Sequence, residues 1–122
     1  MCIRDRYKES FVKYKEATRL NPEYSNAFNN WGLALLDLAK QENNSKLFEE
    51  SEAKLKRAVE LDGSPYNLSC LYALQKKKDD AFLYLRKSLE ERHSTPQFVR
   101  EDKDWKAYLE DQDFIALLAE FE

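Results

Sequence analysis

Apolar side chains recur along this chain at helical spacing, and their pattern predicts eight helices. Large apolar residues stand three, four and seven positions apart in most segments, which is the period of an amphipathic helix and not the alternation of a strand. Only two glycines and three prolines interrupt the chain. The predicted helices cover residues 6–20, 23–41, 46–61, 65–77, 79–92, 96–101, 104–110 and 112–121. We therefore expect an all-α fold.

One motif of small and large residues occurs three times. A small residue is followed four positions later by a large apolar one, and three positions after that by another small one. These spacings place all three side chains on one face of a helix, where small residues let a neighbouring helix approach closely. The three copies are Ser10, Tyr14 and Ala17; Ser51, Leu55 and Ala58; and Ala81, Leu85 and Ser88.

A second motif precedes two copies of the first. Apolar residues stand at positions i, i+3 and i+7, with a small residue at i+4, so a core-facing stripe again carries one close contact point. An isolated glycine inside a helix costs about 1 kcal/mol relative to alanine, and close packing is the usual reason that it is tolerated. The two copies are Phe28, Trp31, Gly32 and Leu35, and Pro65, Leu68, Ser69 and Tyr72.

The alternation of these motifs resembles the tetratricopeptide repeat (TPR), written W-x2-L-G-x2-Y and then A-x3-F. Phe28-x2-Trp31-Gly32-x2-Leu35 stands in place of the first part, Pro22 is the closing proline, and 66–74 with Ala81-x3-Leu85 is the best single match. The resemblance implies a TPR-type α-α superhelix, a right-handed solenoid of antiparallel helix pairs. It also implies a scaffold or adaptor for protein–protein interaction.

The spacing of the repeats departs from the family period of about 34 residues. Ala17 and Ala58 are 41 residues apart, and Ala58 and Ser88 are 30 apart. We place the extra residues in 41–47, with 42–45 as a loop, and the shortening at the turn 62–65, with Ser64 as N-cap and Pro65 at the first helical position. The expected domain is 7–122, divided into a half repeat at 7–21, a repeat with an insertion at 22–62, a repeat at 63–93 and capping helices at 94–122.

Residues 1–6 resemble translated adapter sequence that heads some open reading frames from metagenomic assemblies. The segment reads Met1-Cys2-Ile3-Arg4-Asp5-Arg6. We expect this leader to be non-native and the natural N-terminus to be missing. The native localisation therefore stays unknown, although a cytoplasmic one is compatible.

The array is expected to open with the second helix of a repeat, whose first helix is absent. Phe11, Tyr14 and Leu20 would then lack one packing neighbour, because half a repeat cannot bury its apolar face alone. We predict that this N-terminal helix is the least stable element or that it associates with another copy of the chain.

The last 29 residues, 94–122, differ in character, and the run from Arg100 to Phe114 is similar to the segment that closes many bacterial TPR arrays. Thr95-Pro96, Asp104 and Asp113 each open a short apolar-periodic segment. We expect a cap in which Trp105, Leu109, Phe114 and Leu118 cover the last repeat. An alternative for Trp105 is a partner-binding anchor, but large aromatics at helical spacing usually face the core.

Charge and composition argue against several classes of partner. The chain has 20 Lys and Arg against 23 Asp and Glu, with both signs mixed, so we expect no nucleic-acid binding. No apolar stretch approaches the roughly 20 residues of a membrane span. The longest basic run, 76–78, is followed by Asp79-Asp80, and we interpret it as a solvated turn at which one helix ends and the next begins.

Catalytic and metal-binding patterns are weak. Cys2 and Cys70 are too few for a disulfide framework or a four-cysteine zinc site, and His93, the single histidine, reads as an exposed residue at a helix end. Cys70 lacks a nearby cation in the sequence that would activate its thiol. No phosphate loop, nucleophile elbow or zinc-protease motif occurs. We expect neither an enzyme nor a cofactor.

The resemblance implies that the first helix of each repeat lines a concave groove. Asn30 and Asn67 occupy matching places there, and their amides offer both donor and acceptor to a peptide backbone. The alternative is that asparagine is merely a compatible polar surface residue. The predicted site consists of Asn26, Asn29, Asn30, Leu33, Asp37, Tyr66, Asn67, Cys70 and Leu74.

In a subclass of the TPR family, lysines and arginines on this face bind C-terminal carboxylates. The predicted site has asparagine, leucine and tyrosine there instead, so binding of such carboxylates is disfavoured. We expect a protein or peptide partner with a neutral or mildly basic extended segment. Two other functions stay open: a self-assembly module, and a regulatory array for an enzyme domain that lies upstream.

Overall fold

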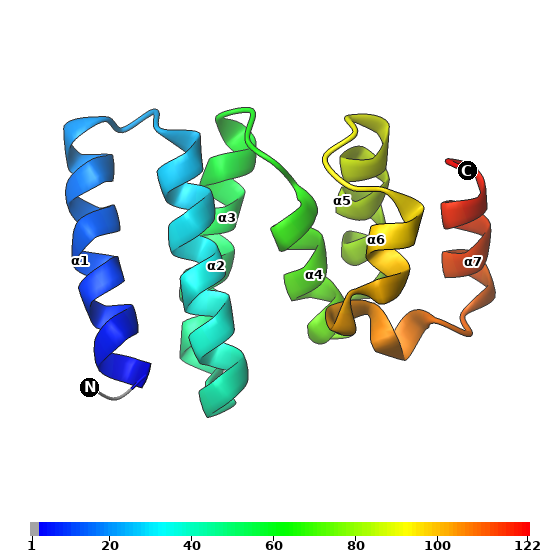
Figure 1. Cartoon of the computed structure of the whole chain (residues 1–122), viewed down its shortest axis with the longest axis horizontal. Coiled ribbons are helices and arrows are strands. Elements are labelled where there is room, and N and C mark those ends of the chain that lie inside the picture. The colour runs from blue at the N-terminus through cyan, green and yellow to red at the C-terminus, as the bar shows by residue number, and fades with distance from the viewer. Residues whose placement is uncertain (1–2) are drawn as a thin grey trace. The chain divides into compact units, whose positions relative to one another are not determined.

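A computed structural model describes residues 3–122, and within that range it contains helices and no strand. Every predicted helix is present, which confirms the all-α fold, and the 104–110 segment is a short 3-10 helix. Met1 and Cys2, part of the expected leader, lie outside the described residues. The elements are α1 (Ile3–Leu20), α2 (Ser25–Glu42), α3 (Ser45–Glu60), α4 (Tyr66–Leu74), α5 (Lys78–Glu90), α6 (Pro96–Glu101), η1 (Lys103–Tyr108) and α7 (Gln112–Ala119) (Figure 1).

The chain divides into two compact units, Met1–Asn67 and Leu68–Glu122, which we call the N-terminal and C-terminal units. In the N-terminal unit, α1, α2 and α3 lie side by side, and each runs opposite to the one before it (Figure 1). Their core is aliphatic at its centre and aromatic at its edge. It consists of Leu35, Leu38, Ala39 and Leu47, against which Tyr7, Phe11, Trp31 and Phe48 pack.

Close contact between α2 and α3 depends on Gly32. A Cβ at this position would stand 2.5 Å from the side chain of Leu55, well inside contact distance. The hydroxyl of Ser51 donates a hydrogen bond of 2.7 Å to the Gly32 carbonyl, and Ser51 is fully buried. The prediction that small residues mediate close helix packing is therefore confirmed here, and Ala58 and Ala81 are also fully buried.

The connection between α2 and α3 corrects one prediction. The segment 42–45 was expected to be a loop that holds an insertion. Instead α2 continues through Glu42 and α3 begins at Ser45, so only Asn43 and Asn44 lie between them. The side chain of Asn44 accepts hydrogen bonds from the backbone N–H groups of Lys46 and Leu47 and caps α3. The helices continue because this two-residue turn already satisfies their end groups.

Four helices end in the same backbone motif, which the sequence did not reveal. A residue one or two positions past the end of each helix has a positive φ, and the N–H of the following residue donates to the carbonyl five residues back, as in a Schellman motif. Glycine usually occupies this left-handed position, because a Cβ is unfavourable there. Here it is held by Asn43, Asp62, Lys76 and Arg92. Gly63 follows Asp62, and a Cβ on it would meet the Ala58 carbonyl oxygen at 2.8 Å.

Aromatic side chains form the centre of the C-terminal unit. Trp105 is fully buried and stacks on Phe114, with ring centroids 5.4 Å apart, and Phe82 and Tyr108 complete the cluster. The core role predicted for Trp105, Phe114 and Leu118 is thus confirmed. The prediction for Leu109 was wrong: its side chain is exposed, because η1 ends at Tyr108 and Leu109 lies just past the end of that helix.

Ion pairs hold α7 at both ends. Lys78, in the first turn of α5, lies 2.9 Å from Asp111 and 2.8 Å from Asp113. Arg86 of α5 lies 2.6 Å from Glu120, and Arg100 of α6 pairs with Glu122. The basic run 76–78 is therefore more than a solvated turn, since its last residue ties the start of α5 to the start of α7.

The exposed residues of α1 are mixed in character. Val12 is 69% exposed and Leu20 is 70% exposed. Phe11 and Tyr14 are half-buried, and Phe11 packs on the core of the N-terminal unit. Leu20 is exposed, as expected for a residue that lacks a packing neighbour. Phe11, in contrast, packs against the core of the N-terminal unit.

Candidate interaction surface on helix α2

Four side chains form a narrow exposed stripe along α2. Asn26, Asn30 and Leu33 are exposed and Asp37 is half-buried, and we call these four residues the α2 stripe. At 100° per residue they fall within about 60° of helical arc and extend over about 16 Å. The opposite side of α2 carries the buried residues Ala27, Leu35, Leu38 and Ala39. The stripe is thus the face that the hydrophobic core does not use.

Two asparagines join α2 to the start of α4 within the N-terminal unit. The side-chain amide of Asn67 donates a hydrogen bond of 3.3 Å to the side-chain carbonyl of Asn29, and both residues are half-buried. The sequence placed Asn67 in a position that matches Asn30, but its bonded neighbour is Asn29. Asn67 and Asn29 therefore have a structural role, and Asn30 is left exposed.

Two of the predicted site residues are buried. Tyr66 is 8% exposed and Cys70 only 2%. They were expected to present their side chains on an open face, and their burial corrects that expectation. Leu74, the last residue of α4, is half-buried. Helix α4 is short and almost wholly apolar, so most of its sides pack, and helical spacing alone did not reveal which side stayed open.

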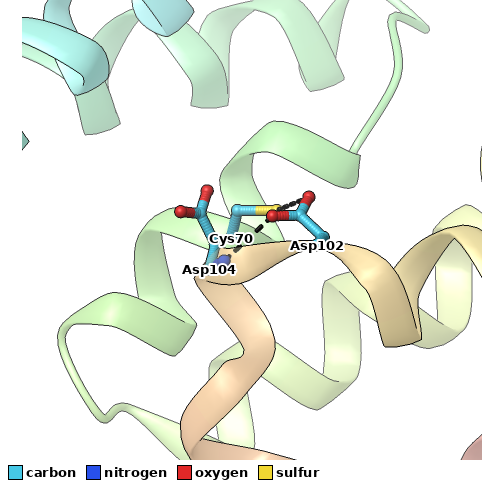
Figure 2. Close-up of side chains that lie close together, drawn as sticks. All are labelled: Cys70, Asp102 and Asp104. Atoms are coloured by element: carbon cyan, nitrogen blue, oxygen red, sulfur yellow. Dashed lines mark hydrogen bonds between the residues drawn. The ribbon is translucent and has the colours of Figure 1, made fainter.

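Cys70 contacts a capping aspartate, and with Asp104 they are the one group of potential metal ligands found among the described residues (Figure 2). The thiol Sγ lies 3.9 Å from Asp102 Oδ2, while Asp102 Oδ1 accepts a hydrogen bond of 2.9 Å from the Asp104 N–H. Single ligand atoms of the three residues lie within 4.8 Å of one another. Asp102 acts as the N-cap of η1, which gives the cluster a structural purpose.

The charge near the stripe is partly compensated. Asp37 lies 3.8 Å from Lys40, which continues the same helical face but is not among the predicted site residues. The i, i+3 spacing of Asp37 and Lys40 in the sequence indicates that the two side chains lie close together. Lys54 of α3 stands over the ring of Trp31, 4.0 Å from its centroid, on a different side of α2. The stripe thus offers two amides, one leucine and one screened carboxylate.

Seven of the nine predicted side chains belong to the N-terminal unit, and all of these except Tyr66 are at least partly exposed. Cys70 and Leu74 belong to the C-terminal unit. Comparison with known proteins finds no matching family model, no matching curated protein and no matching solved structure. Among the helices of residues 3–122, none is both long and apolar enough to cross a membrane.

Proposed function

We propose that the N-terminal unit is a protein-interaction module that binds an extended peptide segment along the α2 stripe. The observation that carries this proposal is the continuous stripe of exposed Asn26, Asn30 and Leu33 with half-buried Asp37, on a helix whose other side is packed. The resemblance of the sequence to the tetratricopeptide repeat supports it, because first helices line the binding groove in that family.

The spacing of the two amides suits an extended backbone. Asn26 and Asn30 are one helical turn apart, about 6 Å along the axis. In an extended chain, backbone groups that point the same way recur every second residue, about 6.6 Å apart. Each asparagine can therefore donate to one peptide carbonyl and accept from the adjacent N–H. The stripe is long enough for about five extended residues.

Leu33 and Asp37 would set the preference of the stripe. Leu33 offers apolar surface to one side chain of the ligand. Asp37 favours a base near that end, although Lys40 weakens its field. A net hydrogen bond is worth about 0.5–1.5 kcal/mol, so two bidentate amides and one apolar contact give modest affinity. The expected ligand is a neutral or mildly basic extended segment.

The test uses a peptide selected from a random display library on the purified full chain. The dissociation constant of the synthetic peptide is measured by fluorescence anisotropy for the wild type and for the double variant Asn26→Ala and Asn30→Ala. Both positions are exposed and helical, so alanine should not unfold α2. We expect binding to weaken about tenfold, the loss of roughly 1.4 kcal/mol.

Gln112→Ala is the matched control, because it removes an exposed side-chain amide from the first turn of α7. Affinity should be unchanged in this variant. If the selected peptides bind the double variant as tightly as the wild type, the α2 stripe is not the binding surface.

A second candidate function is self-assembly through α1, favoured by the exposure of Val12 and Leu20. Sedimentation velocity of the chain over a range of concentrations tests it. Self-assembly predicts a concentration-dependent dimer that the variant Val12→Lys with Leu20→Lys converts to monomer. A wild-type chain that sediments as a monomer at every concentration contradicts self-assembly.

A further inference from the structure

A groove between α5 and α7 in the C-terminal unit combines apolar walls with an acidic setting. It has a volume of about 460 Å³. Its apolar lining comes from Phe82 and Leu83 of α5 and from Ala116 and Leu117 of α7. Leu83 is 61% exposed, so a large apolar side chain of this lining meets water. Water-exposed apolar surface in a groove is typical of docking sites.

The charged residues that line the groove are acidic on balance, because Asp79, Asp113 and Glu120 stand against one base, Arg86. The last 13 residues, 110–122, contain five carboxylates and no lysine or arginine. Three bases reach these carboxylates: Lys78, Arg86 and Arg100. Asp79, which lines the groove, and the adjacent Asp80 add two further carboxylates in the first turn of α5. At the groove, two bases, Lys78 and Arg86, therefore stand against four carboxylates, Asp79, Asp111, Asp113 and Glu120, which leaves a surplus of negative charge.

We propose that the α5–α7 groove docks an amphipathic helix that carries lysine or arginine beside its apolar face. A groove between two helices suits a third helix, whose residues at i, i+3 and i+7 can enter the apolar lining. Basic residues on the flanks of that helix complement Asp79 and the acidic last segment, whereas an acidic helix is repelled. This surface is separate in residues and in chemistry from the α2 stripe, and it does not depend on the function proposed there.

Helical periodicity does not predict the groove, because its walls come from two segments about 30 residues apart. The acid-only run 110–122 was the available signal. It was interpreted only as a cap, since Phe114, Leu117 and Leu118 account for its apolar period. Leu83 alone on the exposed face of α5 forms no repeated apolar pattern that would predict a groove.

The probe is a fluorescein-labelled model helix of about 14 residues, roughly four turns, with leucine on one face and lysine on its flanks. A counterpart of the same sequence with glutamate in place of lysine controls for apolar attraction. Binding to the full chain is measured by anisotropy. We expect the basic helix to bind at least about tenfold more tightly than the acidic one, with an advantage that shrinks between about 0.05 and 0.5 M salt.

Two matched pairs of variants locate the site. Leu83→Arg should weaken binding of the basic helix at least about tenfold, whereas Leu109→Arg, equally charged at another exposed leucine of the same unit, should change it less than about threefold. Asp79→Asn should weaken binding more than Asp80→Asn, because Asp79 lines the groove and Asp80 does not. Far-UV circular dichroism verifies that each variant keeps its helices.

Several results would overturn the proposal. Equal affinity for the basic and acidic helices removes the charge argument. Equal weakening by Leu83→Arg and Leu109→Arg indicates diffuse electrostatic attraction and no groove. If the chain sediments as a dimer that Leu83→Arg alone dissociates, the occupant is a second copy of the chain and not a basic helix.

Discussion

The two units reach stability in different ways. The N-terminal unit has three helices of 18, 18 and 16 residues, an aliphatic core and eleven residues of each charge sign. The C-terminal unit relies on elements as short as six and eight residues, an aromatic cluster and ion pairs between helices. Isolated helices of that length are unstable in water, so they depend on external contacts. The long helices are stabilised by close packing against one another, whereas the short elements depend on the aromatic cluster and the ion pairs.

All three short elements have a side-chain N-cap, whereas the longer helices vary: Asn44 caps α3, and α5 has no side-chain cap. The three short elements α6, η1 and α7 each begin with a side chain that accepts backbone N–H groups, from Thr95, Asp102 and Asp111 respectively. Helix α2 begins at Tyr24 without any side-chain cap. A cap contributes about 1 kcal/mol, a large share of what a two-turn helix can gain and a small share for a five-turn helix.

The largest expected effect comes from removing the aromatic anchor. Trp105→Ala should destabilise the C-terminal unit by about 3–5 kcal/mol, because a fully buried indole leaves a cavity among Phe82, Tyr108 and Phe114. Hydrogen exchange followed by mass spectrometry should show faster exchange in η1 and α7 and unchanged rates in α2. Phe98→Ala, at an exposed aromatic of α6, is the control. Equal acceleration in both units would mean that they unfold together.

The contact between α2 and α3 in the N-terminal unit should be destabilised when side-chain volume is added to it. Gly32→Ala gains up to about 1 kcal/mol of helix propensity. Its Cβ, however, would stand 2.5 Å from the buried Leu55 side chain. We expect a net loss of about 1–3 kcal/mol in the free energy of unfolding, measured with urea. Adding Leu55→Ala should cost less in the Gly32→Ala background than in the wild type; additive effects would mean that the two residues are not in contact.

Glycine at the left-handed helix ends of the C-terminal unit should raise its stability. Lys76→Gly and Arg92→Gly should each raise the free energy of unfolding by about 1 kcal/mol, since glycine adopts positive φ without a Cβ clash. Lys87→Gly, in the last turn of α5, should lower it by about the same amount. Thermal melts distinguish these results, and a loss in all three variants would show that glycine entropy outweighs the strain.

The smallest effect is a pH response confined to the C-terminal unit. Hydrogen bonding to Lys78 lowers the pKa of Asp111, and hydrogen bonding to Arg86 lowers the pKa of Glu120. Carboxyls with a lowered pKa stabilise the folded state above their unfolded pKa, and that contribution disappears as the pH falls through the lowered folded pKa. Exchange in α7 should therefore accelerate in acid before exchange in α2. The variant Lys78→Met with Arg86→Met should reduce this difference, and an unreduced difference would assign it to other groups.

Much of the fold followed from local pattern. Apolar periodicity located all eight helices, and the small residues Gly32, Ser51, Ala58 and Ala81 were recognised as contact points before their neighbours were known. Side chains that face a packed seam must be small or apolar, so this information is written at fixed spacing along the chain. The exposed face of α2 followed in the same way, as the side left over.

The sequence by itself determined where helices form, which face of α2 is buried and which small residues let helices touch, because helix geometry fixes the order of side chains around each axis. Only the tertiary structure decided that Cys70 and Tyr66 are buried and that Leu109 is exposed. It also decided that Lys78 and Arg86 tie down α7, and that an apolar groove opens between α5 and α7. These outcomes depend on which segment comes to lie beside another, and neighbours about 30 residues apart leave no periodic trace in the chain.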